Sequence, residues 1–174
     1  MYIYEFELGN INKNKLKEFL ENKGIKYHID KNKMKVFLED FYFGYRFDKF
    51  IKSIEAGFNI ELSSNILYNN WDILYIDLKQ VFEKKENHII RIEGRIIGED
   101  GKAIREIMNK TASNIIIDDR YIYLLGDSIS IQAAYEAIKR LVNGQKHDHV
   151  YEFLNKYVKN LKNKEIEIYK YTKQ

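Results

Sequence analysis

Hydrophobic positions alternate with polar ones in several short runs, and each run predicts a β-strand. Residues 2–8, YIYEFEL, read as a strand with one buried face, because side chains two positions apart point to the same side. Residues 25–29 and 34–38 predict two strands around the polar turn at 30–33. Residues 71–78, WDILYIDL, predict a further strand. The first half therefore carries a strand and a hairpin, and another strand follows.

Hydrophobic positions three and four residues apart predict helices between these strands. Leu16, Phe19 and Leu20 share one helical face, and Gly24 marks the expected end of that helix. A second helix is expected before Gly57, on a stripe formed by Phe47, Phe50, Ile51 and Ile54. Residues 60–67 predict a further short helix.

The second half shows the same alternation of patterns. Residues 88–98, HIIRIEGRIIG, predict a strand that runs into a glycine turn, and Ile104, Ile107 and Met108 predict an amphipathic helix after it. The runs NIII and RYIYLLG predict two strands around residues 118–119. A long helix follows, with the stripe Ile131, Ala134, Tyr135, Ile138, Leu141 and Val142, and a last helix is expected from about His149.

One supersecondary order thus occurs twice, without obvious identity between the two copies. The predicted fold class is α+β, with two tandem domains of one type, each a three-stranded sheet with helices on one face, plus a C-terminal helix. The expected boundaries are a first domain over 1–70, a connecting strand and linker over 71–87, and a second domain with its trailing helix over 88–174.

Composition narrows the possible functions. The chain has 174 residues, of which 45% are hydrophobic, so it can bury a real core. It contains no cysteine, which excludes disulfides, thiolate nucleophiles and sulfur-ligated zinc. No secretory leader and no long apolar run is visible, so a soluble, cytoplasmic protein without a membrane partner is expected. The net charge of +3 is a weak argument for nucleic acid, and a motif must carry that case.

The informative motif is I-G-x-x-G-x-x-I, which runs from Ile97 to Ile104. Two glycines allow a sharp turn and let a nucleic-acid backbone approach without Cβ atoms in the way. The loop also presents N–H groups at the start of a helix, where the partial positive charge favours phosphate. Followed by a helix, two strands and a long helix, this loop is typical of KH domains, which hold single-stranded RNA. We call Gly98–Gly101 the clamp loop.

The candidate RNA-binding residues lie in and around the clamp loop. Besides Gly98, Glu99, Asp100 and Gly101, the apolar floor is assigned to Ile97, Ile104 and Ile115, and phosphate contacts are assigned to Arg95, Lys102 and Arg105. The alternative is that the glycines only form a tight turn and that the isoleucines are ordinary core. The two carboxylates repel phosphate and predict modest affinity or a second binding surface.

Other chemistries fit the sequence poorly. A nucleotide-binding Walker loop fails because Ile96 stands at the first glycine position and Ala103 replaces the hydroxyl residue, and a dinucleotide fingerprint fails on spacing. His147-Asp148-His149 has no further partner for a metal. Neither a Ser/His/Asp arrangement nor a carboxylate cluster accompanies the loop, so we expect no enzyme activity, no catalytic residues, no metal and no cofactor.

From residue 71 onward the sequence resembles the archaeal members of the Pno/Dim family of two-KH small-subunit ribosome-assembly factors. The resemblance rests on FIKSIEAGFN, ILYIDLKQVF, RIEGRIIGEDGKAIREI, YIYLLGD and AYEAIKRLVNG followed by HDHVYEFL. It implies type I KH-like domains and binding at the 3′ end of small-subunit (16S) ribosomal RNA. It also implies work beside the PIN-domain endonuclease Nob in rRNA processing, and contact with the alpha subunit of translation initiation factor two.

The sequence departs from that family in two places. Residues 9–16 contain only Gly9, so the first domain is expected to have lost its clamp, while Lys13, Lys15 and Lys17 read as a solvated helix face. The usual Thr-Arg after G-K is Ala103-Ile104, which removes a phosphate contact. A protein-binding scaffold with vestigial RNA binding therefore stays open as the alternative function. We expect a monomer.

Overall fold

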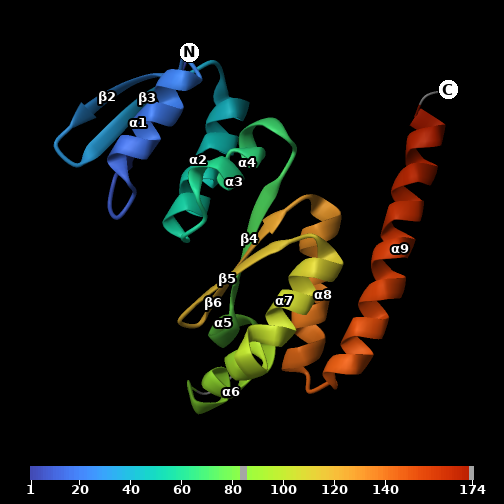
Figure 1. Ribbon diagram of the computed structural model, residues 1–174. Helices are drawn as coiled ribbons and strands as arrows, with labels where there is room; N and C mark the ends of the chain where they lie inside the picture. Colours follow the sequence, from blue (N-terminus) through green and yellow to red (C-terminus); the bar gives the residue numbers. More distant parts are fainter. Residues whose placement is uncertain (83–85, 173–174) are drawn as a thin grey trace. The chain divides into compact units, whose positions relative to one another are not determined.

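The computed structural model describes residues 1–82 and 86–172, and the chain divides into two compact units, Met1–Trp71 and Asp72–Gln174 (Figure 1). Each unit contains one three-stranded antiparallel sheet. The predicted α+β class with two three-stranded sheets is confirmed.

The first unit contains the predicted strand, helix, hairpin and helix in that order. Its sheet has the strand order β1-β3-β2. The elements are β1 (Tyr2–Glu7), α1 (Lys13–Asn22), β2 (Lys26–Asp30), β3 (Lys33–Leu38), α2 (Phe41–Glu55), α3 (Ile60–Ser63) and α4 (Asn65–Tyr68). The helix expected over 60–67 is two short helices, and α2 begins earlier than its apolar stripe because Asp40 caps its first turn through Phe43 N–H.

The core of the first unit lies between the sheet and helices α1 and α2. Phe6 pairs with Met34 across the sheet, and both are buried against Leu16 of α1 and Phe47 of α2. The buried residues of this face recur at every second position in the strands and at every third or fourth position in the helices. The sequence shows the same pattern. Packing of this face stabilises the unit.

The second unit contains a longer set of helices around its sheet, whose strand order is β4-β6-β5. The elements are β4 (Asp72–Asp77), α5 (Leu78–Phe82), α6 (Glu86–Ile97), the 3₁₀ turn η1 (Glu99–Gly101), α7 (Lys102–Thr111), β5 (Asn114–Asp118), β6 (Tyr121–Gly126), α8 (Ser128–Val142) and α9 (His147–Thr172). Strand β4, expected in a connecting segment, is an edge strand of this sheet. Residues 83–85 of the expected linker lie outside the described residues.

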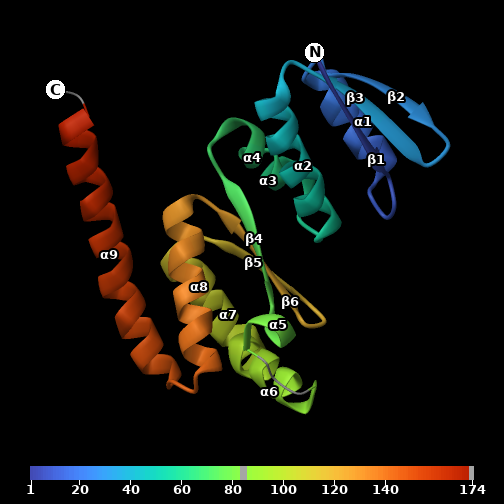
Figure 2. The ribbon, with the colours of Figure 1, turned by 180° about the vertical axis from the view of Figure 1, so that it is seen from behind.

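Helices α6, α7, α8 and α9 contribute to one core with the inward face of the second sheet. Ile76, Ile122 and Leu124 point from the strands into this core. The last helix begins at His147, two residues earlier than expected, and packs on α7 and α8 through the buried side chains of Val150 and Leu154 (Figures 1 and 2). None of the helices in the described part of the chain is long and apolar enough to span a membrane.

The strand expected over 88–98 is wrong, because this segment lies in helix α6. Its buried side chains are Ile89, Ile92 and Ile96, spaced three and four residues apart. Packing of this helical face into the core overrides two local signals against a helix, the β-branched isoleucines and Gly94. The clamp loop therefore connects two helices and does not follow a strand.

Candidate nucleic-acid interface

The clamp loop is a short irregular turn between α6 and α7. The N–H of Gly98 still bonds to the carbonyl of Gly94 at 2.9 Å, so α6 is intact up to the loop. The N–H of Gly101 then bonds to the Gly98 carbonyl at 3.1 Å, and α7 begins at Lys102. The chain thus passes from α6 to α7 within four residues, and the loop lies at the start of α7.

Three backbone angles in the clamp loop lie in the left-handed region. The φ angles are 73° at Gly98, 49° at Asp100 and 72° at Gly101. Glycine adopts such angles without steric penalty, and aspartate is among the residues that tolerate them. The two glycines of the motif are therefore required by the shape of the loop.

Gly98 is also constrained by close packing. A Cβ atom at this position would lie 2.5 Å from the Cβ of Ala103 and 2.8 Å from its nitrogen. At Gly101 the nearest atom would be Nη1 of Arg105 at 2.9 Å, the end of a flexible side chain. Gly98 therefore holds the loop against α7, whereas Gly101 leaves the loop accessible from outside.

The predicted phosphate-binding side chains separate into two groups. Lys102 and Arg105 are exposed on the first turns of α7, close to the clamp loop. Arg95 is half-buried, and its guanidinium turns to the end of α8, where Nε donates to the Leu141 carbonyl at 3.3 Å and Nη2 to the Gln145 carbonyl at 2.7 Å. In this arrangement two of the Arg95 donors bond to carbonyls at the end of α8 and stabilise that helix end.

The predicted apolar floor is also divided. Ile97 is 38% exposed and Ile104 is half-buried, so both present apolar surface beside the loop. Ile115 is buried in the core and contributes to the fold. Ile90 was missed by the sequence analysis: it is 67% exposed and lies on the face of α6 that also carries Gly94 and Ile97. A helical reading of this segment would have placed these three residues together.

Negative charge surrounds the same surface. The side chains of Glu99 and Asp100 are exposed, as expected. Burial, and secondarily the charge of Asp119 in the turn between β5 and β6, raises the pKa of Glu93 above its ordinary value. The site can therefore attract phosphate through backbone N–H groups, Lys102 and Arg105, against repulsion from nearby carboxylates.

The region of the first unit that was compared with the clamp loop has a different structure. Residues 8–12 connect β1 to α1, and the side chain of Asn12 caps that helix by accepting from the Lys15 N–H at 3.1 Å. Lys13 and Lys15 are exposed and Lys17 is half-buried on α1. Across the described residues no cluster of three or more potential metal ligands is present.

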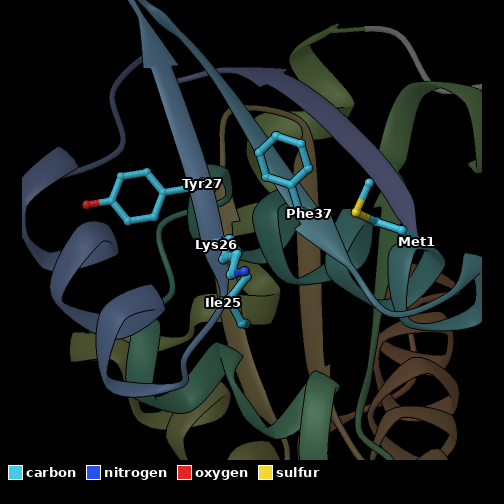
Figure 3. Close-up of a pocket in the computed structure, with 5 residues that line it drawn as sticks. All are labelled: Met1, Ile25, Lys26, Tyr27 and Phe37. Carbon is cyan, nitrogen blue, oxygen red and sulfur yellow. The ribbon is translucent and has the colours of Figure 1, made fainter.

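The first unit has a depression of its own, beside the edge strand β2. It measures about 490 Å³ and is lined by Met1, Ile25, Lys26, Tyr27 and Phe37 (Figure 3). Tyr27 points away from Phe37 in this view, and its hydroxyl donates to Glu21 at 2.6 Å. The lining is almost wholly apolar and lacks the convergent polar groups of a small-molecule site.

Comparison with known families identifies the second unit. Residues 73–159 match the family described as eukaryotic type KH-domain (KH-domain type I), in the form of the second KH domain of PNO1. The chain is 28% identical over 120 residues to the KH domain-containing protein MJ0443 of Methanocaldococcus jannaschii, covering 69% of this chain and 52% of that protein. It is 34% identical over 116 residues to the pre-rRNA-processing protein PNO1 of Saccharomyces cerevisiae, covering 65% of this chain and 42% of that protein. The chain thus spans about half the length of the curated relatives it matches.

Solved structures resemble the chain over most of its length. A protein of unknown function, APE0754 from Aeropyrum pernix, matches with a TM-score of 0.79 and 24% identity, covering 99% of this chain and 98% of that one. The complex of a/eIF2alpha, aDim2p and rRNA from Pyrococcus horikoshii matches with a TM-score of 0.73 and 21% identity, covering 91% and 95%. At these identities the likeness establishes a shared fold.

Proposed function

This chain belongs to the eukaryotic-type KH-domain family that includes the second KH domain of PNO1, and we propose that it binds single-stranded RNA through the clamp loop without reacting with it. The observation that carries the proposal is the backbone of the loop, with φ angles of 73° at Gly98 and 72° at Gly101 at the start of α7. This geometry lets an RNA backbone come close to the backbone of the loop and to the start of α7.

The side chains next to the clamp loop are suited to an RNA strand that runs along the loop. Lys102 and Arg105 supply exposed positive charge, and Ile97 and Ile104 supply apolar surface on which bases can lie. We expect one base to lie on each of these two isoleucine side chains. The proposed contacts are the clamp loop for the phosphates and these two isoleucines for the bases.

The relatives point to the kind of RNA. The relative from Saccharomyces cerevisiae is named a pre-rRNA-processing protein, and one structural neighbour was solved with rRNA and a/eIF2alpha. We propose that this chain binds ribosomal RNA, specifically the 3′ end of the small-subunit RNA. We further propose that it acts as a cytoplasmic monomer beside the PIN-domain endonuclease Nob, and that the initiation-factor-two alpha subunit is a partner.

A second candidate function is a scaffold for protein partners with weak RNA binding. The exposed carboxylates of Glu99 and Asp100 favour it, because like charges oppose the approach of a phosphate backbone. Under this alternative, replacing the clamp glycines would leave function in ribosome assembly intact.

The test is binding of the full chain to a short strand matching the 3′ end of its own small-subunit rRNA, compared with a scrambled strand over a salt series. We expect tighter binding to the matching strand, loss of that binding in Gly101→Asp, and intact RNA after incubation. Gly101 is the better position for this variant, since Gly98 is packed against Ala103. Equal, steeply salt-dependent binding to both strands would contradict the proposal and favour the scaffold.

A further inference from the structure

A cavity of about 180 Å³ lies between the clamp loop and the beginning of α9. Residues of the loop, of the first turn of α7 and of the first two turns of α9 line it: Gly98, Glu99, Lys102, Ala103, His147, Asp148 and Tyr151. Two segments that are almost fifty residues apart in the sequence therefore meet beside the proposed RNA-binding loop.

Hydrogen bonds hold the two walls of the cavity together. Nε2 of His147 lies 2.8 Å from the carbonyl oxygen of Arg95, and with Nε2 protonated the ring donates to this carbonyl. The Arg95 guanidinium in turn bonds to the carbonyl of Leu141, in the last turn of α8, and to that of Gln145, on the connection that leads to α9. Further along α9, Val150 is fully buried in the core. The cavity is thus part of the folded unit before any ligand binds.

One part of the lining is aromatic. The ring of Tyr151 is half-buried, and its centroid lies 6.2 Å from that of His147. Burial, and then the charges of Glu106 and Asp148, raise the pKa of the Tyr151 hydroxyl, so the phenol stays neutral at physiological pH. An uncharged aromatic ring beside an RNA-binding loop is the kind of surface on which an unstacked base lies.

The charged part of the lining selects against phosphate. Glu99 and Asp148 contribute two carboxylates, whereas Lys102 contributes one ammonium group. An ionised carboxylate only accepts hydrogen bonds, so a suitable ligand must offer N–H donors and no negative charge of its own. The amino groups of adenine, cytosine and guanine meet this requirement. Uracil has no amino group, and its one ring N–H lies between two carbonyl oxygens that a carboxylate repels.

We propose that this cavity binds one base of the RNA strand, next to the nucleotides held by the clamp loop, with its ring against Tyr151 and its amino group donating to Asp148. The inference rests on the proposed function and adds a specificity to it. Helix α9 becomes part of the RNA site. At one position of the RNA strand, the protein then prefers a base with an amino group over uracil.

The test uses the full chain and the short rRNA-derived strand, with Asp148→Ala as the variant. Asp148 is exposed, so the variant should fold as the wild type does. Glu152→Ala is the matched control, because Glu152 is an exposed carboxylate on α9 that does not line the cavity. Removing negative charge should on its own tighten binding to RNA in both variants. The proposal predicts the opposite for Asp148→Ala, about a ten- to hundredfold rise in Kd, as expected from losing a hydrogen bond to a charged group.

A second arm identifies the base. Each adenosine, cytidine or guanosine of the strand is replaced in turn by uridine, and Kd is measured for the wild type and for Asp148→Ala. At one position the replacement should weaken binding to the wild type and have no further effect on the variant, since both changes remove the same contact.

The outcomes separate this inference from the proposed function. If the wild type binds, Gly101→Asp abolishes binding, and Asp148→Ala binds as tightly as Glu152→Ala, the base-binding cavity is overturned while the clamp loop stands. The base-binding cavity is overturned in the same way if no position of the strand shows coupling to Asp148. If the wild type binds none of the strands, the proposed function fails and the inference fails with it.

Discussion

His147 and Arg95, 52 positions apart in the sequence, are joined by a 2.8 Å hydrogen bond between the imidazole Nε2 and the main-chain carbonyl. The Arg95 side chain bonds back to the carbonyls of Leu141 and Gln145, on either side of the end of α8. These contacts tie the connection between α8 and α9 to the last turn of α6, three residues before Gly98. The position of the clamp loop therefore depends on the C-terminal helix.

The first prediction concerns Arg95. Arg95→Gln should lower the free energy of unfolding by about 1 kcal/mol, because the carbonyls at the end of α8 lose their donor. Chemical denaturation measures this loss, and hydrogen exchange should rise at the amides of residues 141–147. The salt dependence of RNA binding should keep its slope. A slope that became shallower would instead show that Arg95 neutralises a phosphate, as its position in the sequence predicts.

The second prediction concerns the exposed cations at the start of α7. Lys102→Gln and Arg105→Gln should each reduce the slope of log K against log salt by about 0.7, the value for one phosphate contact on a single strand. Thermal stability should not change, since both side chains are exposed. Lys33→Gln in β3 of the first unit is the control and should leave the slope as it is. If all three variants kept the slope of the wild type, Lys102 and Arg105 would not contact phosphates.

The third prediction separates the two glycines of the clamp loop. Gly101→Ala should lose about 1 kcal/mol of stability because of its left-handed backbone. Gly98→Ala should lose clearly more, about 2 kcal/mol or above, because its methyl group would also overlap Ala103. Denaturation of the two variants side by side gives the comparison. Equal losses would mean that the loop can move away from α7 without penalty.

The fourth prediction is a pH dependence that arises from Glu93. Its pKa is higher in the folded chain than in the unfolded one, so the folded state binds the proton more tightly. Stability should therefore fall as pH rises through the interval between the ordinary glutamate pKa and the raised value. Glu93→Gln should lack this fall and be more stable than the wild type near pH 7, by at most about 0.5 kcal/mol because the group is largely solvated.

Thermal unfolding of Glu93→Gln and wild type at about pH 4 and pH 7 tests this dependence, since these values bracket the ordinary glutamate pKa. The stabilisation should be present at the higher pH and absent at the lower one. The exposed Glu152→Gln serves as the control for loss of a carboxylate on the helical surface. A stabilisation of equal size at both pH values would contradict the assigned cause.

Most of the fold could be predicted from local patterns. Strands β2 and β3 surround a polar turn, and the stripe of α8 from Ile131 to Leu141 has helical spacing, so the periodicity alone identifies them. Helix α6 could not be identified in this way. Its isoleucines and Gly94 favour a strand locally, and only the packing of Ile89, Ile92 and Ile96 into the core of the second unit decides for a helix.

In the candidate site too, some features could be predicted from the sequence and others could not. The glycines of the clamp loop follow from a short motif, and their φ angles have the sign that the motif requires. The orientation of Arg95 depends on the carbonyls of Leu141 and Gln145, which local sequence cannot place beside it. His147 has the same limitation, since its partner is a backbone oxygen in another helix. Long-range hydrogen bonds to backbone atoms leave no periodic trace in a sequence.

The contact between Gly98 and Ala103 leaves no room for a side chain at position 98. A Cβ at position 98 would lie 2.5 Å from the methyl group at 103 and 2.8 Å from the main-chain nitrogen of that residue, so a smaller residue at 103 removes only one of the two overlaps. Substitutions at 103 should therefore not rescue a side chain at 98. A library that randomises both positions should return glycine at 98 whatever residue it returns at 103.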